Sequence, residues 1–105
     1  LAQGLQLTEA FYWDRNDESR AFAKRFAARH GGKMPTSIQA GFYTAAKHYL
    51  EQIKALNTDD ADKVMARMKS TPADDPIFGK SVIRADGRKV HDVYLFEVKS
   101  PAESK

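Results

Sequence analysis

Hydrophobic positions recur at helical spacing through the first half of the chain. Between residues 17 and 29, Phe22 and Phe26 lie four apart with an alanine beside each, which predicts a helix with one apolar stripe. The residues able to cap its first N–H groups are Asp14, Asn16 or Asp17. We expect the helix to end at the Gly31-Gly32 pair, because glycine readily adopts the left-handed conformation that follows many helices.

The longest periodic segment follows Pro35 and runs to about residue 56. Thr36 or Ser37 is expected to cap its start, and Asn57 to end it. Its three-and-four spacing predicts a helix whose apolar stripe is buried. That stripe consists of Ile38, Phe42, Ala45, Ala46, Tyr49, Leu50, Ile53 and Leu56.

A third helix is expected over residues 59–69, with Thr58 as its cap. The positions predicted to be buried in it are Ala61, Val64, Met65 and Met68. Residues 70–76 are rich in proline and aspartate and are expected to form a loop, in which Asp74 and Asp75 act as turn formers.

Extended structure is predicted at both ends of the chain. The opening run, residues 5–13, first alternates and then becomes aromatic, which indicates a strand. Residues 77–84 and 90–98 are also strand-like, and Asp86-Gly87 between them is typical of a hairpin turn. The second of these strands is apolar on both faces, so it needs cover on both sides, which a lone hairpin cannot provide.

This missing cover leads us to expect a piece of a longer protein. The sequence begins at Leu1 without a methionine and stops at Lys105 just after a strand-like run, which favours the same expectation. A chain of 105 residues suffices for one small domain. No apolar run approaches the roughly 18 residues of a membrane-spanning helix.

Composition narrows the possible chemistry. The chain has no cysteine, which excludes disulfides, thiolate zinc sites and a cysteine nucleophile, and suits the cytoplasm and the bacterial periplasm equally. The formal net charge of +3 is mild. A basic set, Arg20, Lys24, Arg25 and Arg29, lies on the first helix opposite its phenylalanines, so we interpret it as a solvated face and expect no nucleic-acid partner.

No catalytic motif is present, so we expect a protein that is not an enzyme. The phosphate-binding, dinucleotide-binding, zinc-protease and serine-hydrolase patterns are all missing. His30, His48 and His91 lie on different elements without the spacing of metal ligands, and we expect no metal site and no cofactor. His48 is expected on a helix surface and His91 at a strand edge.

Two aromatic clusters are candidates for a binding surface, namely Phe11-Tyr12-Trp13 and Phe42-Tyr43. Each can belong to the core, or can line a pocket between lobes. Phe42 and Tyr43 lie near the start of a helix, whose free N–H groups favour a carboxylate. The residues alone leave core and pocket equally open.

The order of these elements resembles a known family. The chain is similar to the C-terminal part of a periplasmic solute-binding protein of the branched-chain amino-acid (leucine/isoleucine/valine-binding) type, which serves an ABC transporter. The matching segments are Gly4-Leu5, Phe11-Tyr12-Trp13-Asp14, residues 22–26 before Gly31-Gly32, Pro35 with residues 40–46, the helix with Val64 and Met68, residues 75–79, Arg84-Ala85-Asp86-Gly87 and residues 94–99.

The resemblance implies an α/β chain that is a fragment of a two-lobed type I periplasmic-binding-protein fold, with three helices followed by a β-hairpin. Residues 1–13 would form a strand and hinge crossover, residues 14–75 the helices of one lobe, and residues 76–105 a second crossover and the hairpin of the other lobe. The ligand would be an amino acid or a small aromatic or hydrophobic carboxylate held between the lobes. Its contacts would come from Trp13, Gln39, Phe42 and Tyr43.

The resemblance also implies a periplasmic location and an ABC transporter permease as partner. A ligand-sensing receptor ectodomain of the same fold is the alternative function. An isolated piece of such a protein would expose surfaces that are otherwise covered, so we expect self-association by strand pairing or by exchange through the hairpin.

Overall fold

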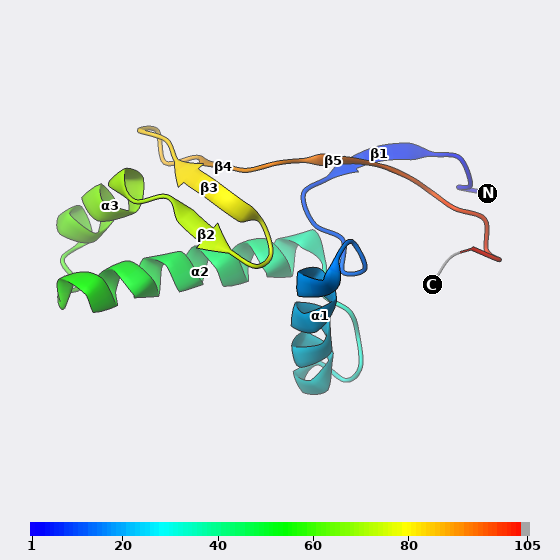
Figure 1. Cartoon of the computed structure of the whole chain (residues 1–105), viewed down its shortest axis with the longest axis horizontal. Coiled ribbons are helices and arrows are strands. Elements are labelled where there is room, and N and C mark those ends of the chain that lie inside the picture. The colour runs from blue at the N-terminus through cyan, green and yellow to red at the C-terminus, as the bar shows by residue number, and fades with distance from the viewer. Residues whose placement is uncertain (104–105) are drawn as a thin grey trace.

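The computed structural model describes residues 1–103 and combines three helices with two small antiparallel sheets (Figure 1), which confirms the predicted α/β class. The elements are β1 (Gln6–Glu9), α1 (Asp17–Arg29), α2 (Ser37–Leu56), α3 (Ala61–Ser70), β2 (Ala73–Asp75), β3 (Gly79–Ile83), β4 (Lys89–Val90) and β5 (Tyr94–Glu97). Within the described residues no helix is long and apolar enough to cross a membrane.

Polar caps fix the ends of the first two helices where the sequence predicts them. Asn16 caps α1, and its side-chain oxygen accepts a hydrogen bond from the N–H of Ser19 at 2.8 Å. Thr36 precedes α2, and Asn57 ends it in the left-handed conformation, with φ of 52°. The bounds of α1 and α2 therefore agree with the prediction.

The start of α3 differs from the prediction. Asp60 rather than Thr58 caps this helix, and its carboxylate accepts from the N–H of Lys63 at 3.0 Å. The hydroxyl of Thr58 instead accepts from the N–H of Asp60 at 3.3 Å, so it shapes the turn before the helix. Val64 and Met68 are buried as expected, whereas the expected burial of Ala61 and Met65 was wrong.

The strands pair differently from the expected single hairpin. The turn at Asp86-Gly87 does join two antiparallel strands, but the pairing of β3 with β4 stops at Val90 opposite Val82. The Asp86 carboxylate accepts a hydrogen bond from the N–H of Arg88 at 3.1 Å, and this bond together with the Arg84 side chain lowers the pKa of Asp86. The hairpin is therefore present but short.

The rest of the predicted second strand, β5, pairs with β1 at the other end of the sequence. Figure 1 shows this two-stranded ribbon extending away from the helices. The expected strand over residues 5–13 ends at Glu9, because Phe11 turns into the core. Part of the expected loop over residues 70–76 is also a strand, since β2 pairs with β3.

Helix α2 is rotated relative to the predicted orientation. Its buried residues form a row at every fourth position, Ala40, Thr44, His48 and Gln52. The expected buried stripe is instead largely exposed, with 82% of Ile38, 78% of Phe42 and 60% of Leu50 accessible to solvent. The short connection between α2 and α3 folds α3 back against the second half of this row, where His48 and Gln52 contact Met68 and Arg67. At the other end of the row, Ala40 packs in a cluster with Ile77 and Phe78.

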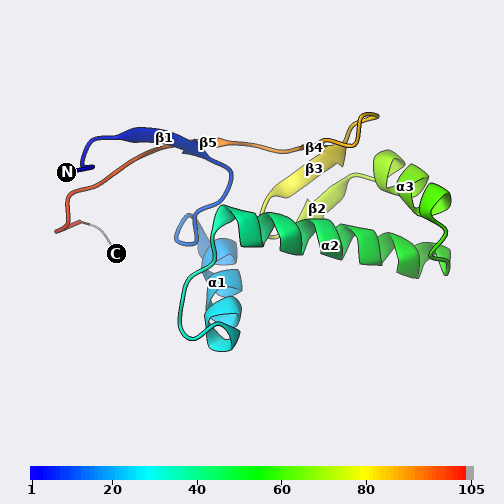
Figure 2. The same cartoon turned by 180° about the vertical axis from the view of Figure 1, so that it is seen from behind.

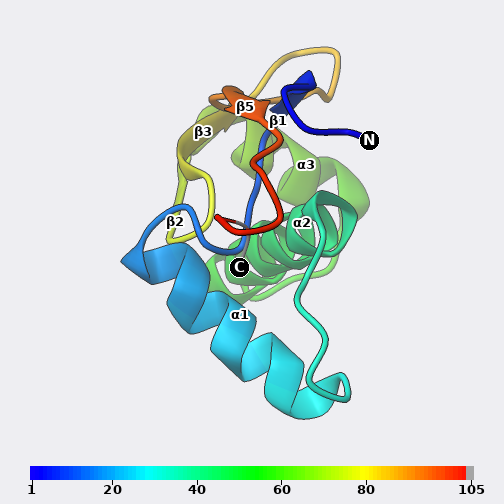
Figure 3. The same ribbon diagram turned by 90° about the vertical axis from the view of Figure 1, so that its right-hand side faces the viewer.

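The strands and α1 lie on different sides of α2. Strands β2 and β3 lie along one side of the helix, and α1 alone projects from the opposite side (Figures 1 and 2). The view along α2 in Figure 3 shows the same separation. The radius of gyration is 16.3 Å, against about 13 Å for a compact domain of this length. The described chain is thus more open than a closed single core.

The core lies where α1 meets the start of α2 and the turn before β3. It consists of Phe11, Phe22, Ala40, Ile77 and Phe78, with Ala10, Trp13 and Phe26 packed at its edge. The rings of Phe11 and Phe22 meet edge-on with centroids 6.1 Å apart. This cluster fixes the base of α1 against α2 and so defines the groove between them.

Candidate functional site

A broad apolar groove lies between α1 and α2. Its volume is about 1310 Å³, and its apolar lining includes Phe22 and Phe26 from α1 and Ile38, Phe42, Ala46 and Leu50 from α2. Three of the four predicted ligand-binding residues, Gln39, Phe42 and Tyr43, line this groove, and Trp13 does not. The structure therefore brings the three helix residues together and leaves the tryptophan apart.

The three groove residues differ in their surroundings. The ring of Tyr43 packs on Phe22 with centroids 4.8 Å apart, and 37% of the residue is exposed. Phe42 is 78% exposed, so its ring is accessible in the groove. Gln39 is half-buried, and its side-chain oxygen accepts a hydrogen bond from the N–H of Thr36 at 3.0 Å.

The hydrogen bond made by Gln39 gives this residue a structural role that the sequence analysis did not assign to it. It is the third residue of α2, and a glutamine there can satisfy the N–H of the cap residue. Because the oxygen is occupied, the amide nitrogen is the group of Gln39 that can donate a further hydrogen bond.

Trp13 lies at the edge of the core, where the chain leaves β1 for α1. It is half-buried, and its ring centroid is 6.0 Å from that of Tyr12. Nearby, the guanidinium of Arg15 lies 4.3 Å from the ring centroid of Tyr94 and donates to the backbone oxygen of Ile77 at 3.4 Å. The segment around Trp13 is thus held to both β5 and the turn before β3.

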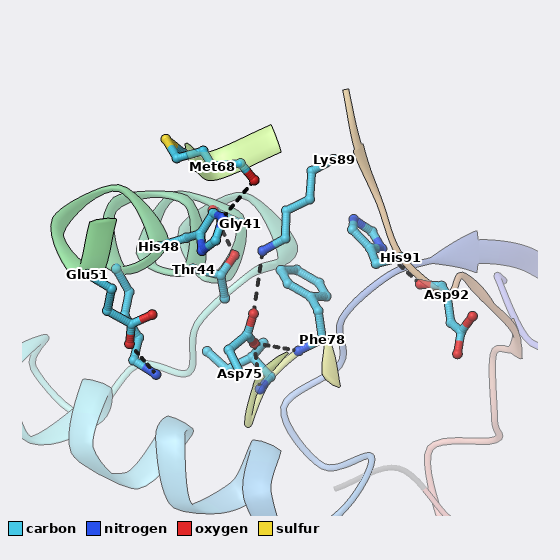
Figure 4. Close-up of polar contacts among 12 residues, drawn as sticks. Gly41, Thr44, His48, Glu51, Met68, Asp75, Phe78, Lys89, His91 and Asp92 are labelled. Atoms are coloured by element: carbon cyan, nitrogen blue, oxygen red, sulfur yellow. Dashed lines mark hydrogen bonds and ion pairs between the residues drawn. The ribbon is translucent and has the colours of Figure 1, made fainter. Parts of the chain in front are cut away.

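A second polar cluster, which the sequence analysis treated only as a turn, surrounds Asp75 (Figure 4). Its carboxylate is almost fully buried and accepts from the N–H groups of Ile77 and Phe78 at 2.9 and 2.8 Å. The other carboxylate oxygen lies 3.4 Å from Nζ of Lys89. The sequence signal for this cluster is an aspartate near the end of a loop. Its side chain can accept hydrogen bonds from the backbone N–H groups two and three residues later.

The ring of Phe78 contacts two further side chains in this Asp75 cluster. Lys89 places its ammonium 5.3 Å from the ring centroid, and His91 stacks on the ring with centroids 4.5 Å apart. His91 also donates from Nδ1 to the backbone oxygen of Asp92 at 2.9 Å. The cluster therefore joins β2, the turn before β3, β4 and the segment after β4, and it stabilises their arrangement.

The interpretation of His48 as a surface residue was wrong. Only 4% of it is exposed, and Nε2 lies 3.4 Å from the backbone oxygen of Met68 (Figure 4). It is buried because its face of α2 meets α3, where a carbonyl of the last helical turn lacks a partner within the helix. Among residues 1–103, no group of three or more histidine, aspartate or glutamate side chains is placed to hold a metal ion.

Comparisons with known proteins agree with this architecture. The family model described as periplasmic binding protein matches residues 1–104. A periplasmic binding protein from Burkholderia mallei is 46% identical, with a TM-score of 0.92. A branched chain amino acid ABC transporter periplasmic ligand-binding protein from Burkholderia xenovorans is 43% identical, with a TM-score of 0.94. No curated protein matches the chain.

The structural matches extend to more distant proteins. An amino acid ABC transporter substrate-binding protein from Pseudomonas fluorescens is 26% identical, with a TM-score of 0.84. Each of these three matches covers 99% of this chain. In turn, the chain spans only 27% of the B. mallei protein and 28% of the other two.

These matches settle the family. Periplasmic binding proteins are non-enzymatic components of transport systems that bind small molecules outside the cytoplasm. The described helices and antiparallel strands superpose on solved members over nearly the whole chain. The chain therefore belongs to the periplasmic binding protein family, and its residues form part of the type I fold of that family.

Proposed function

We propose that this chain is one part of a periplasmic solute-binding protein that delivers its ligand to the permease of an ABC transporter. The observation that carries the proposal is 43% identity, over 99% of the chain, to a protein named as a branched chain amino acid ABC transporter ligand-binding protein. The proposed ligand is an amino acid or a small aromatic or hydrophobic carboxylate. The groove between α1 and α2 supports that ligand class, because its lining is mostly apolar and also includes the cations Arg25, Arg29, Lys47 and Lys54.

We assign the proposed ligand contacts to Trp13, Gln39, Phe42 and Tyr43. The amide nitrogen of Gln39, at the N-terminal turn of α2, would donate to the ligand carboxylate, where the helix dipole also favours negative charge. Phe42 and Tyr43 would cover the apolar part of the ligand. Trp13 lies outside the groove, so its contact requires the ligand to reach from the groove to the segment between β1 and α1.

The same proposal divides the chain at two crossovers between lobes. The first lies in residues 1–13 and the second begins at residue 76, with residues 14–75 in one lobe and the remainder in the other. In support, Phe11 and Ile77 share the core cluster, and Arg15 hydrogen-bonds to the backbone of Ile77. Crossovers that lie side by side can bend together as one hinge when a ligand closes the lobes.

Ligand binding by the full-length protein is expected to raise its melting temperature. At a ligand concentration 100 times the Kd, the stabilisation is about 2.7 kcal/mol. For a protein as long as the solved relatives, of which this chain spans 27–28%, this corresponds to a shift of roughly 3 °C. The measurement is a thermal-shift screen of amino acids and small aromatic carboxylates. If none of these ligands raises the melting temperature, the proposed function is wrong.

The variant Gln39→Glu gives the site assignment a specific test within that screen. The new carboxylate can still accept the hydrogen bond from Thr36, so the helix start and the melting temperature of the unliganded protein are expected to stay the same. It repels a ligand carboxylate, so the affinity is expected to fall about tenfold or more, which is about 1.4 kcal/mol. Unchanged affinity would remove Gln39 from the site.

We further propose that the isolated chain self-associates through its two-stranded ribbon. Within the described residues, β1 and β5 pair only with each other, and their outer edges offer free N–H and C=O groups beside exposed Leu95. Sedimentation equilibrium of the 105-residue chain is expected to show dimers or larger species as the concentration rises. Leu95→Lys is expected to shift the equilibrium toward monomer, and a wild-type chain that stays monomeric would contradict the proposal.

A further inference from the structure

The ribbon of β1 and β5 meets the helical part of the chain at its base, where the link between β1 and α1 lies beside the start of β5. Beyond that base, the ribbon extends away from the helices (Figure 1). Within the described residues, β1 and β5 pair only with each other. The direction in which the ribbon leaves the helices therefore depends on the side chains at its base.

Arg15 is a side chain at this base that connects three segments. It lies in the link between β1 and α1 and is half-buried. Its Nη2 donates to the backbone oxygen of Ile77, in the turn before β3, at 3.4 Å. Its guanidinium carbon lies 4.3 Å from the ring centroid of Tyr94, the first residue of β5. The guanidinium therefore connects the helical part of the chain to the ribbon.

The contacts of Arg15 are of a kind that can be exchanged. In the described part of the chain no carboxylate forms an ion pair with it, and its buried Nε donates to no acceptor. Arg20 differs, because it pairs with Asp14 and Asp17 at 2.6 and 2.9 Å. A guanidinium oriented by a ring face can move over that ring without breaking an ion pair. The contact between Arg15 and Tyr94 thus suits a joint that moves.

Tyr94 passes this contact on to both strands of the ribbon. It lies opposite Glu9 in the register of β1 and β5. Its ring centroid is 6.4 Å from that of Phe96, and Phe96 in turn meets the ring of Tyr12 edge-on at 5.8 Å. The base of the ribbon is therefore one packed unit, and a shift of Arg15 over Tyr94 changes the direction of both strands together.

We propose that Arg15 is a positioning residue that fixes the orientation of the ribbon relative to the helices and thereby favours closure of the lobes on a ligand. In the proposed division of the chain, Arg15 belongs to one lobe and Tyr94 to the other, so their contact spans the hinge. Without this contact the lobes sample additional orientations, and a ligand must order them when it binds. The effect on ligand binding rests on the proposed function, whereas the effect on the ribbon does not.

The orientation of the ribbon is measured directly with spin labels on the full-length protein. Cysteines for labelling replace Gln6 on β1 and Lys63 on α3, which are both exposed, and any other cysteine is replaced by serine. Pulsed electron–electron double resonance then gives the distribution of distances between the labels. Arg15→Gln is expected to widen this distribution in the folded, unliganded protein, which a loss of stability alone would not do.

Matched variants identify the contact that matters. Arg20→Gln removes a cation five residues later whose ion pairs stay within its own segment, and it is expected to leave the distribution unchanged. Tyr94→Phe keeps the ring and is expected to have no effect, whereas Tyr94→Leu is expected to widen the distribution as Arg15→Gln does. Combining Arg15→Gln with Tyr94→Leu is expected to add nothing further. If Arg15→Gln widens the distribution no more than Arg20→Gln, the proposal is wrong.

Ligand affinity tests the link to closure. With a ligand found in the thermal-shift screen, Arg15→Gln and Tyr94→Leu are each expected to raise the Kd about fivefold, the shift that corresponds to one cation–π contact. Arg15→Lys keeps the charge without the planar guanidinium and is expected to fall between. If only Arg15→Gln weakens binding, Arg15 contacts the ligand itself and the proposal is wrong.

The two measurements separate this proposal from the proposed function. If no ligand is found in the screen, the proposed function fails, but the distance distributions still decide whether Arg15 orients the ribbon. If ligands bind and the distributions widen while the Kd of both variants stays unchanged, the orientation of the ribbon does not control closure and that half of the proposal is overturned.

Discussion

Phe22→Ala is expected to lower the free energy of unfolding of the 105-residue chain by about 3–5 kcal/mol. Phe22 is 5% exposed and contacts three rings, those of Phe11, Phe26 and Tyr43. Truncation removes these contacts and leaves a cavity where α1 meets the core. Because small domains are stable by only about 5–15 kcal/mol, this change removes a large part of the total.

Urea denaturation followed by far-ultraviolet circular dichroism measures this effect. The matched control is Phe42→Ala, which makes the same chemical change on α2 at a side chain that is 78% exposed. We expect that control to change the free energy of unfolding by no more than about 0.5 kcal/mol. Equal losses for the two variants would show that the core does not lie where α1 meets the start of α2.

The second large effect is expected at Asp75. Asp75→Ala is expected to cost about 3 kcal/mol, because it leaves two buried backbone N–H groups and the Lys89 ammonium without their acceptor. Lys89 is only 18% exposed in its side chain, so water replaces the lost partner incompletely. The effect should appear in the denaturation midpoint, with β2, β3 and β4 losing structure together.

Two control variants separate the contributions within the Asp75 cluster. Asp75→Asn keeps an oxygen for the N–H groups of Ile77 and Phe78 and loses the charge, so its cost is expected to be about half that of the alanine variant. Asp74→Ala changes the exposed neighbour in the same strand and is expected to cost less than about 0.5 kcal/mol. If the two alanine variants are equally stable, the buried pair contributes nothing to the fold.

Local signals predicted the helices of this chain well. The bounds of α1 and α2 follow from Asn16, Thr36 and Asn57, whose side chains or backbone act within one turn of their own position. The turn at Asp86-Gly87 is equally local. These features do not depend on distant residues. Periodicity, capping and turn residues are therefore sufficient to predict them from the sequence.

Apart from the cap of α3, the errors concern contacts between distant elements. The spacing of apolar residues predicted that Ile38 and Leu50 would be buried, but spacing defines a face and does not supply its cover. His48 and Gln52 are buried because α3 folds back on their side of α2. The pairing of β5 with β1 likewise depends on segments that lie about ninety residues apart.

The candidate site was predictable only in part. The residues alone singled out Phe42 and Tyr43, and the family resemblance added Gln39. The three residues share a groove because they lie within two turns of one helix. Trp13 belongs to a different segment, and no pattern in the sequence places it relative to α2. The Asp75 cluster was missed because its importance comes from burial, which depends on Lys89 arriving from β4 and His91 from the segment after it.

The ribbon of β1 and β5 has a consequence for the order in which the chain folds. Its register joins Gln6 to Glu97, so forming it closes a loop of about ninety residues, at an entropic cost of roughly 4 kcal/mol before any contact is gained. The turn between α2 and α3 closes over a few residues and costs far less. The helices and the hairpin must therefore assemble first and bring the two strands together, so the ribbon forms last and is the first part to open.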